Sequence, residues 1–164
     1  MEKITVEEST RLSSPHLFAL AVTKNKEGRL NIMGLSWFTF VSFNPGQILL
    51  SISRKSCTNA NIKSVGIITL CMPIEEIKEQ AFKCCTLSGN SVDKLKETGI
   101  ELVEIEGFEI PAVKKSSVAW SLRLNNTIET GAQSIFIADI VSAVSLNVKK
   151  HLMAFDGYER LDAV

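Results

Sequence analysis

The stretch NIMGLSWFTFVSFNPGQILLSISRKSCTNANI, residues 31–62, decides the fold of this chain. Apolar and β-branched residues over 31–43 and 47–53 predict two extended segments, and Asn-Pro-Gly at 44–46 predicts a tight turn between them. Gly34 interrupts the first segment, where we expect a β-bulge or a close approach of another part of the chain. The pattern is typical of neighbouring strands in a β structure.

A short helix is expected soon after the second strand. Thr58 is a favourable N-cap, and the helix is predicted to run to about Val65, where Gly66 stops it. Helix N-termini carry unpaired N–H groups and the positive end of the helix dipole, so a helix start with nearby hydroxyls and Lys55 can hold a phosphate. Thr58 can equally be only a cap, and Lys55 only a solvated surface lysine.

A second feature lies upstream of that helix and consists of three consecutive residues. Ser36, Trp37 and Phe38 can supply a flat surface and backbone donors for a planar ring. Trp37 can also be an ordinary core residue, and Asn31 can serve only to fix a local turn. A phosphate site beside a platform for a planar ring suggests a nucleotide-like cofactor, and these residues alone do not say which one.

The rest of the chain adds strands and a few helices. Strands are expected at 17–23, 67–72, 118–126 and 134–146, and helices from near Pro73 to about Cys85 and from Asp93 to Thr98, ending at Gly99; residues 101–111 are expected to be irregular, and no element is predicted for the tail at 148–164. Short strands at this spacing favour a closed or partly closed antiparallel barrel. We find no repeat or linker, so we predict one mainly β domain over residues 1–164.

Composition narrows the class of protein. A chain of 164 residues with 45% apolar residues can bury one core. The formal net charge is zero, with 18 acidic and 18 basic side chains, which argues against nucleic acid or an anionic membrane as the main partner but leaves a local basic patch open. No apolar run reaches membrane-spanning length, and the acidic N-terminus lacks a signal-peptide core, so we expect a cytoplasmic protein.

The reactive side chains suggest no catalytic set and no metal site. The four cysteines, Cys57, Cys71, Cys84 and Cys85, are expected to be reduced in the cytoplasm. The adjacent pair lacks the spacing of a zinc site, and neither histidine lies near a cysteine pair. We interpret Cys84 and Cys85 as structural or incidental, with a redox relay to a cofactor as the alternative. No hydrolase triad or nucleotide-binding glycine pattern occurs.

From Leu17 to Tyr158 the chain resembles the flavin reductase-like, FMN-binding split-barrel family, and within it the flavoredoxin-type branch. The resemblance rests on the order and spacing of several short motifs rather than on any one of them. These are Asn31 six residues before Trp37, Ser36-Trp37-Phe38, Asn44-Pro45, Lys55 with Thr58-Asn-Ala-Asn61-Ile62, Ser88-Gly89, Val92-Asp93-Lys94, Pro111-Ala112 and the segment from Gly131 to Val141.

The resemblance implies a Greek-key split β-barrel that forms a homodimer and holds non-covalent FMN near the subunit interface. It implies that Lys55 and Thr58 contact the phosphate, that Asn31 and Trp37 line the flavin, and that Lys94 comes near the cofactor. The local sequence of Lys94 alone predicts an exposed side chain. The full set of predicted cofactor-binding residues is Asn31, Leu35, Ser36, Trp37, Phe38, Ser51, Ser53, Lys55, Thr58, Asn61, Lys94 and Gln133.

One position departs from the family pattern. The family often has Gly-Asp-His before the penultimate strand, where this chain has Gly131-Ala132-Gln133. An amide replaces a histidine that could titrate near the flavin, which puts a proton-donor role at this position in doubt. The change can also alter the reduction potential or the specificity.

These expectations combine into a functional hypothesis. We expect an FMN-dependent redox protein, a flavin reductase or a flavoredoxin-like electron-transfer protein, that takes electrons from NAD(P)H or a protein donor. Flavin chemistry needs no catalytic side chain, because the cofactor transfers the electrons and the protein binds and tunes it. The alternatives are a non-catalytic FMN-binding or electron-carrier module and a structural homodimer with a degenerate site. The sequence identifies neither the donor nor the acceptor.

Overall fold

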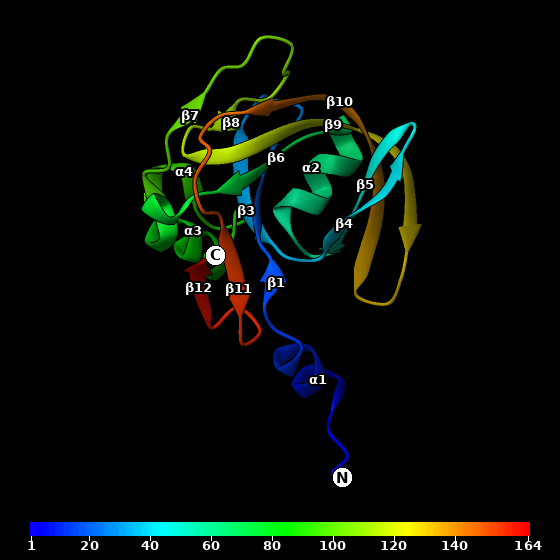
Figure 1. The fold of residues 1–164 in the computed structure, drawn as a ribbon. Helices are drawn as coiled ribbons and strands as arrows, with labels where there is room; N and C mark the ends of the chain where they lie inside the picture. Colours follow the sequence, from blue (N-terminus) through cyan, green and yellow to red (C-terminus); the bar gives the residue numbers. More distant parts are fainter.

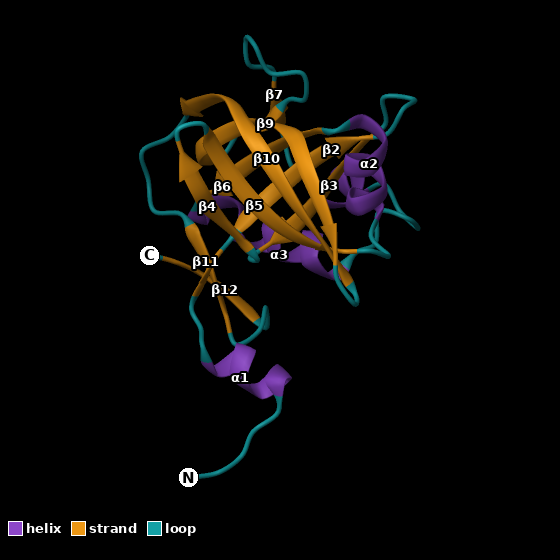
Figure 2. Ribbon diagram, turned by 90° about the vertical axis from the view of Figure 1, so that its right-hand side faces the viewer, coloured by secondary structure: helices purple, strands orange, loops and turns teal.

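The computed structural model describes residues 1–164, and its main feature is a seven-stranded antiparallel sheet that curls into a barrel (Figure 1 and Figure 2). The strand order is β3-β2-β6-β9-β10-β5-β4. Its members are β2 (Ala19–Lys24), β3 (Leu30–Leu35), β4 (Phe38–Phe43), β5 (Gly46–Ser53), β6 (Ile67–Pro73), β9 (Ser116–Glu129) and β10 (Gln133–Ser145). The predicted mainly β architecture is therefore confirmed.

The sheet follows from alternating burial along its strands. In β5, Ile48, Leu50 and Ile52 are buried and alternate with more exposed neighbours, as expected for a strand with one face on a core. Phe136 of β10 lies opposite Leu50 in register and is fully buried. These residues belong to a core cluster inside the barrel, whereas a second cluster that includes Phe18 packs against α3 and the C-terminal strands.

The predicted extended segment over 31–43 is two strands. β3 ends at Leu35 and β4 begins at Phe38, and these consecutive strands form the two outer edges of the sheet. The two-residue linker therefore crosses the gap between the edges. The break falls after Gly34, but the close approach predicted there is confirmed, because a Cβ at Gly34 would overlap Cys85 Sγ and lie 3.0 Å from the Phe18 ring.

The first long helix, α2 (Cys57–Val65), differs from the prediction at its start. Ser56 is the N-cap, and its hydroxyl accepts a hydrogen bond from the Asn59 N–H at 3.1 Å. Thr58 lies inside the first turn, so the prediction of Thr58 as N-cap is wrong. The competing signal was local, since Ser is as good a cap as Thr and lies two residues earlier. Gly66 ends the helix in the left-handed conformation with φ 74°, as predicted.

The next helices are shorter than predicted and begin later. Pro73 ends β6 rather than starting a helix, and a 3₁₀ turn η1 (Glu75–Ile77) precedes α3 (Lys78–Thr86). α4 (Lys94–Thr98) has Asp93 as its N-cap and ends at Gly99, which agrees with the predicted helical turn. The segment expected to be irregular contains only β7 (Leu102–Val103), which pairs with β8 (Ala112–Val113).

Both ends of the chain form elements that the sequence pattern did not predict. They are α1 (Val6–Leu12), β1 (His16–Leu17), β11 (Leu152–Phe155) and β12 (Arg160–Ala163). The last three form a small sheet in the order β1-β11-β12, so the two ends pack together below the barrel (Figure 1). Strands this short show no clear alternation, and their pairing joins residues far apart in sequence. No helix has both the length and the apolarity to cross a membrane.

Candidate functional site

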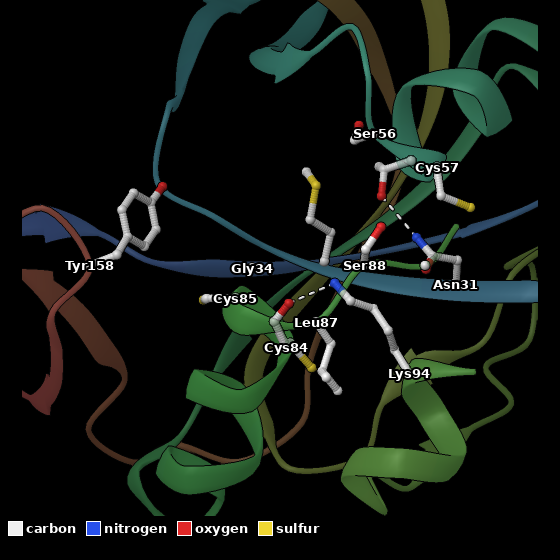
Figure 3. Close-up of a pocket in the computed structure, with 13 residues that line it drawn as sticks. Asn31, Gly34, Ser56, Cys57, Cys84, Cys85, Leu87, Ser88, Lys94 and Tyr158 are labelled. Carbon is white, nitrogen blue, oxygen red and sulfur yellow. Dashed lines mark hydrogen bonds between the residues drawn. The ribbon is translucent and has the colours of Figure 1, made fainter. Parts of the chain in front are cut away.

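A cavity of about 400 Å³ lies between β3, the start of α2, the end of α3, the loop at 87–89 and the start of α4 (Figure 3). Tyr158, from the turn between β11 and β12, completes its wall. The cavity brings together three residues of the predicted cofactor set: Asn31, Thr58 and Lys94. Ser88 and Gly89, which the family resemblance also used, lie on the same cavity.

Asn31 and Thr58 are joined directly. The Asn31 Nδ2 donates to the Thr58 hydroxyl at 2.9 Å, and both side chains are buried. The bond ties β3 to the first turn of α2. Because the Thr58 hydroxyl accepts this bond and does not cap the helix, its own proton is available to a ligand.

The start of α2 supplies further donors. The N–H groups of Cys57 and Thr58 precede the first intrahelical hydrogen bond and point out of the helix. Gly89 comes so close to this region that a Cβ there would overlap Asn31 Oδ1 and lie 3.1 Å from Cys57 Cβ. The site therefore requires glycine at position 89, and it presents backbone and hydroxyl donors beside a positive helix end.

Lys94 forms the opposite wall of the cavity. Its side chain is buried, and Nζ donates to the Cys84 carbonyl oxygen at 2.6 Å, so the exposed side chain predicted from its local sequence is wrong. α4 packs against α3 and β3, which places this lysine inward. Burial lowers the pKa of Lys94.

Three of the four cysteines line the cavity. Burial raises the pKa of the Cys84 thiol to about 11 and that of the Cys85 thiol to about 12. Both are therefore neutral thiols near pH 7 and poor nucleophiles. Cys57 is half-buried and also lines the cavity. All four cysteines are free, and Cys84 and Cys85 lie on the wall of the cavity. Their interpretation as structural or incidental residues stays a prediction.

Several predicted site residues lie outside the cavity wall. Asn61 is buried, donates to the Thr23 hydroxyl at 3.1 Å and lines a smaller adjoining pocket of about 60 Å³. Lys55 is exposed on the turn before α2, where its carbonyl accepts a hydrogen bond from the Asn90 amide at 3.0 Å. Ser53 is exposed, and its carbonyl accepts from the Ser56 hydroxyl at 2.8 Å.

The remaining predicted residues lie on the barrel or on its linker. Leu35 and Phe38 are buried in the core, and the Ser51 N–H donates to the Trp37 carbonyl at 2.8 Å. Trp37 itself is 47% exposed, so it is not a core residue. Gln133 is half-buried at the start of β10, opposite Ser53 in register.

Ser36 and Tyr158 each carry a hydroxyl group, and only the first was predicted as a site residue. Ser36 was predicted, and its Oγ is buried without a hydrogen-bond partner. Tyr158 was not predicted, although the resemblance extended to this residue. A lone tyrosine in a tail without predicted elements carries no local signal, and only the pairing of β11 with β1 brings it to the cavity.

Comparison with known proteins identifies a family whose model matches most of the chain. The model of the flavin reductase like domain matches residues 12–162. An uncharacterized protein of Archaeoglobus fulgidus is 27% identical over 111 residues, which cover 68% of this chain. The match covers 63% of that protein, so the chain spans just under two thirds of this relative's length.

Solved structures agree with that match. Flavoredoxin of Desulfovibrio vulgaris superposes with a TM-score of 0.84 at 22% identity, covering 99% of this chain and 93% of that one. A split barrel domain protein from Shewanella frigidimarina gives 0.85 at 18% identity, covering 96% and 86%. The FMN-binding protein from Thermus thermophilus with bound p-hydroxybenzaldehyde also gives 0.85 at 18% identity, covering 99% and 95%. These similarities confirm the predicted split-barrel fold.

Proposed function

The chain belongs to the family of flavin reductase like domains, and from this we propose that it binds FMN in the cavity at the start of α2 and carries electrons. It would act as a flavin reductase or a flavoredoxin-like protein that takes electrons from NAD(P)H or a protein donor. One observation carries the proposal: Asn31, Thr58 and Lys94 come from three elements and meet at one cavity beside a helix N-terminus.

The chemistry of the donor set fits the phosphate end of FMN. Free N–H groups at the start of α2 and the hydroxyls of Ser56, Thr58 and Ser88 surround this part of the cavity. Gly89 provides the close backbone approach, and Lys94 provides a nearby ammonium group. Lys55, on the exposed turn just before the helix cap, remains a predicted contact at the rim.

The residues of this chain have binding and orienting roles. Bound FMN supplies the electron-transfer chemistry, and the protein determines its position and polarity. The α2 end would hold the phosphate, and the buried Asn31–Thr58 bond would keep the helix start fixed relative to β3. Buried Cys84 and partly buried Cys85 place neutral thiols on the α3 wall, which would limit the access of water from that side.

Comparing three flavins tests the phosphate assignment. Titration of apoprotein should give FMN an affinity roughly ten- to a hundredfold higher than riboflavin, because a charge-assisted phosphate contact contributes about 1.5–3 kcal/mol. FAD should bind more weakly than FMN, since its phosphate carries a bulky adenylate. Equal affinities for FMN and riboflavin would overturn the assignment of the α2 end.

Anaerobic addition of NADH or NADPH separates the functional alternatives. Bleaching of the flavin absorbance would support a reductase that uses nicotinamide. A protein that binds FMN but is reduced only by a protein donor or dithionite would be an electron carrier, as in the second hypothesis. Failure to bind any flavin would leave the structural homodimer as the better explanation.

We also propose that the protein is a homodimer. β4 is an outer strand of the barrel sheet, and its residues Phe40, Val41 and Phe43 are exposed. The exposed fraction of Phe43 is 90%. An unpaired apolar edge of this kind is normally covered. Sedimentation at micromolar concentration should show a dimer, and Phe43→Lys should shift it toward monomer. A wild-type monomer that binds FMN fully would contradict a site that needs the interface.

A further inference from the structure

Tyr158 is the only tyrosine of the chain, and the mechanism proposed above does not use it. It lines the cavity from the turn between β11 and β12. Figure 3 shows Tyr158 on the far side of the cavity from Asn31 and Cys57, with Gly34 between them. The cavity therefore has a helix end, at α2, and a tyrosine end.

The backbone around Tyr158 is held in an uncommon conformation. Asp156, Gly157 and Tyr158 have φ values of 52°, 69° and 76°. The left-handed region is an outlier for a bulky residue, and such residues persist only where the surroundings hold them, often at functional sites. Here the Asp156 N–H donates to Ser14 Oγ at 2.8 Å, and the Tyr158 N–H donates to the Phe155 carbonyl at 3.1 Å.

The side chain is fixed as firmly as the backbone. The Tyr158 ring packs edge-on against fully buried Phe18, with ring centroids 6.4 Å apart. Burial raises the pKa of the Tyr158 phenol, and polar atoms of Ser36 oppose this in part, so the phenol is a neutral donor at pH 7. The Ser36 hydroxyl is itself buried without a hydrogen-bond partner. The tyrosine end of the cavity thus holds the neutral Tyr158 phenol, and the buried Ser36 hydroxyl lies near it.

These features assign a role that rests on the proposed function. We propose that Tyr158 is a positioning residue whose hydroxyl donates a hydrogen bond to the ring end of bound FMN. If the helix end holds the phosphate, the remainder of the molecule extends toward the tyrosine end. A hydrogen bond strengthens when its acceptor gains negative charge, so the hydroxyl would favour the reduced flavin over the oxidised one.

The variant Tyr158→Phe removes the hydroxyl and keeps the ring that packs on Phe18. Its affinity for reduced FMN should fall about tenfold more than its affinity for oxidised FMN, which corresponds to a reduction potential about 30 mV lower for a two-electron couple. The matched control is Glu159→Gln, at the neighbouring exposed position outside the cavity. It should leave the potential unchanged, and both variants should be measured by spectroscopic redox titration.

A second measurement does not depend on turnover or potential. Fluorotyrosine labelling gives one fluorine resonance, because the chain has one tyrosine, and FMN should shift this resonance in wild type and in Glu159→Gln. An unshifted resonance together with an unchanged potential in Tyr158→Phe would overturn the role of Tyr158 and leave the FMN site intact. A wild-type protein that does not bind FMN would overturn both the site and this role.

Discussion

The two walls of the cavity differ in how the chain builds them. One wall comes from the continuous stretch 31–62, in which Asn31 and Thr58 are bonded across β3 and α2. The other combines the end of α3, the start of α4 and the turn at Tyr158, which are separated in sequence and come together only in the folded chain. Local signals therefore locate the end of the cavity that we propose for the phosphate, whereas long-range contacts decide the shape and polarity of the rest.

The walls meet at Gly89, which gives the largest expected effect. A Cβ there would overlap Asn31 Oδ1 and crowd Cys57, so Gly89→Ala should disrupt the Asn31–Thr58 bond and the helix start. We expect FMN affinity to fall by about a hundredfold and the free energy of unfolding by about 1–3 kcal/mol. Flavin titration and urea denaturation measure the two effects.

Gly131→Ala is the matched control, because nothing lies within 4 Å of a Cβ at that position. It should leave both quantities close to those of the wild type. If Gly89→Ala binds FMN as the wild type does, the two walls do not need to meet at this point, and the donor cluster at α2 is not the phosphate site.

Lys94 tests the cavity wall formed by α3 and α4. Because burial lowers the pKa of Lys94, the folded state binds its proton less strongly than the unfolded chain does. The lysine therefore lowers stability near pH 7, and this penalty disappears as pH rises toward 10.5, the ordinary value for lysine. Lys94→Met should gain stability relative to the wild type near pH 7, and the gain should shrink as the pH rises.

The same substitution should weaken FMN binding by roughly ten- to a hundredfold through loss of a charge-assisted contact. Urea denaturation across a pH series measures the stability trend, with Lys96→Met on the exposed side of α4 as control. A difference in unfolding free energy that is constant or grows with pH would contradict a buried ammonium at position 94.

Particular residues show where prediction from sequence succeeded and where it failed. The turn at 44–46, the stop at Gly66 and the close approach at Gly34 were predicted correctly, because each depends on the conformational needs of one or two residues. The N-cap is Ser56 rather than the predicted Thr58, because the sequence offers two adequate capping residues within one turn.

The failures share one physical cause. Lys94 was predicted to be exposed because neighbouring charges suggest a solvated helix, whereas its burial depends on how α4 packs on α3 and β3. Tyr158 was missed because β11 and β12 are short and because β11 pairs with β1, near the other end of the chain. Such contacts have no periodic signature in the sequence.

Two substitutions at the start of α2 should have smaller effects, and together they distinguish helix capping from ligand binding. Ser56→Ala removes the cap and should lower the free energy of unfolding by about 1 kcal/mol. Thr58→Val leaves the cap in place but deprives the Asn31 amide of its acceptor and should weaken FMN binding by about tenfold. Denaturation and flavin titration on both variants show whether the effects separate in this way. If Thr58→Val lowers stability without changing FMN affinity, its hydroxyl serves only the fold.

Gln133 should give the smallest effect, because its half-buried side chain starts β10 beside Ser53 and does not line the cavity. Its amide does not titrate, so the potential of the wild type should show no inflection between about pH 6 and 7 that originates at this position. Gln133→His should introduce one, with the potential rising below it, because an imidazolium favours the electron-rich reduced flavin. FMN affinity should change by less than about tenfold if the residue tunes rather than anchors the ring.

Redox titrations over pH 5 to 8 measure the pH dependence of the potential, and Gln47→His, at the far end of β5, is the control. Indistinguishable curves for Gln133→His and Gln47→His would remove position 133 from the neighbourhood of the flavin and leave the cavity wall to Asn31, Thr58, Lys94 and Tyr158.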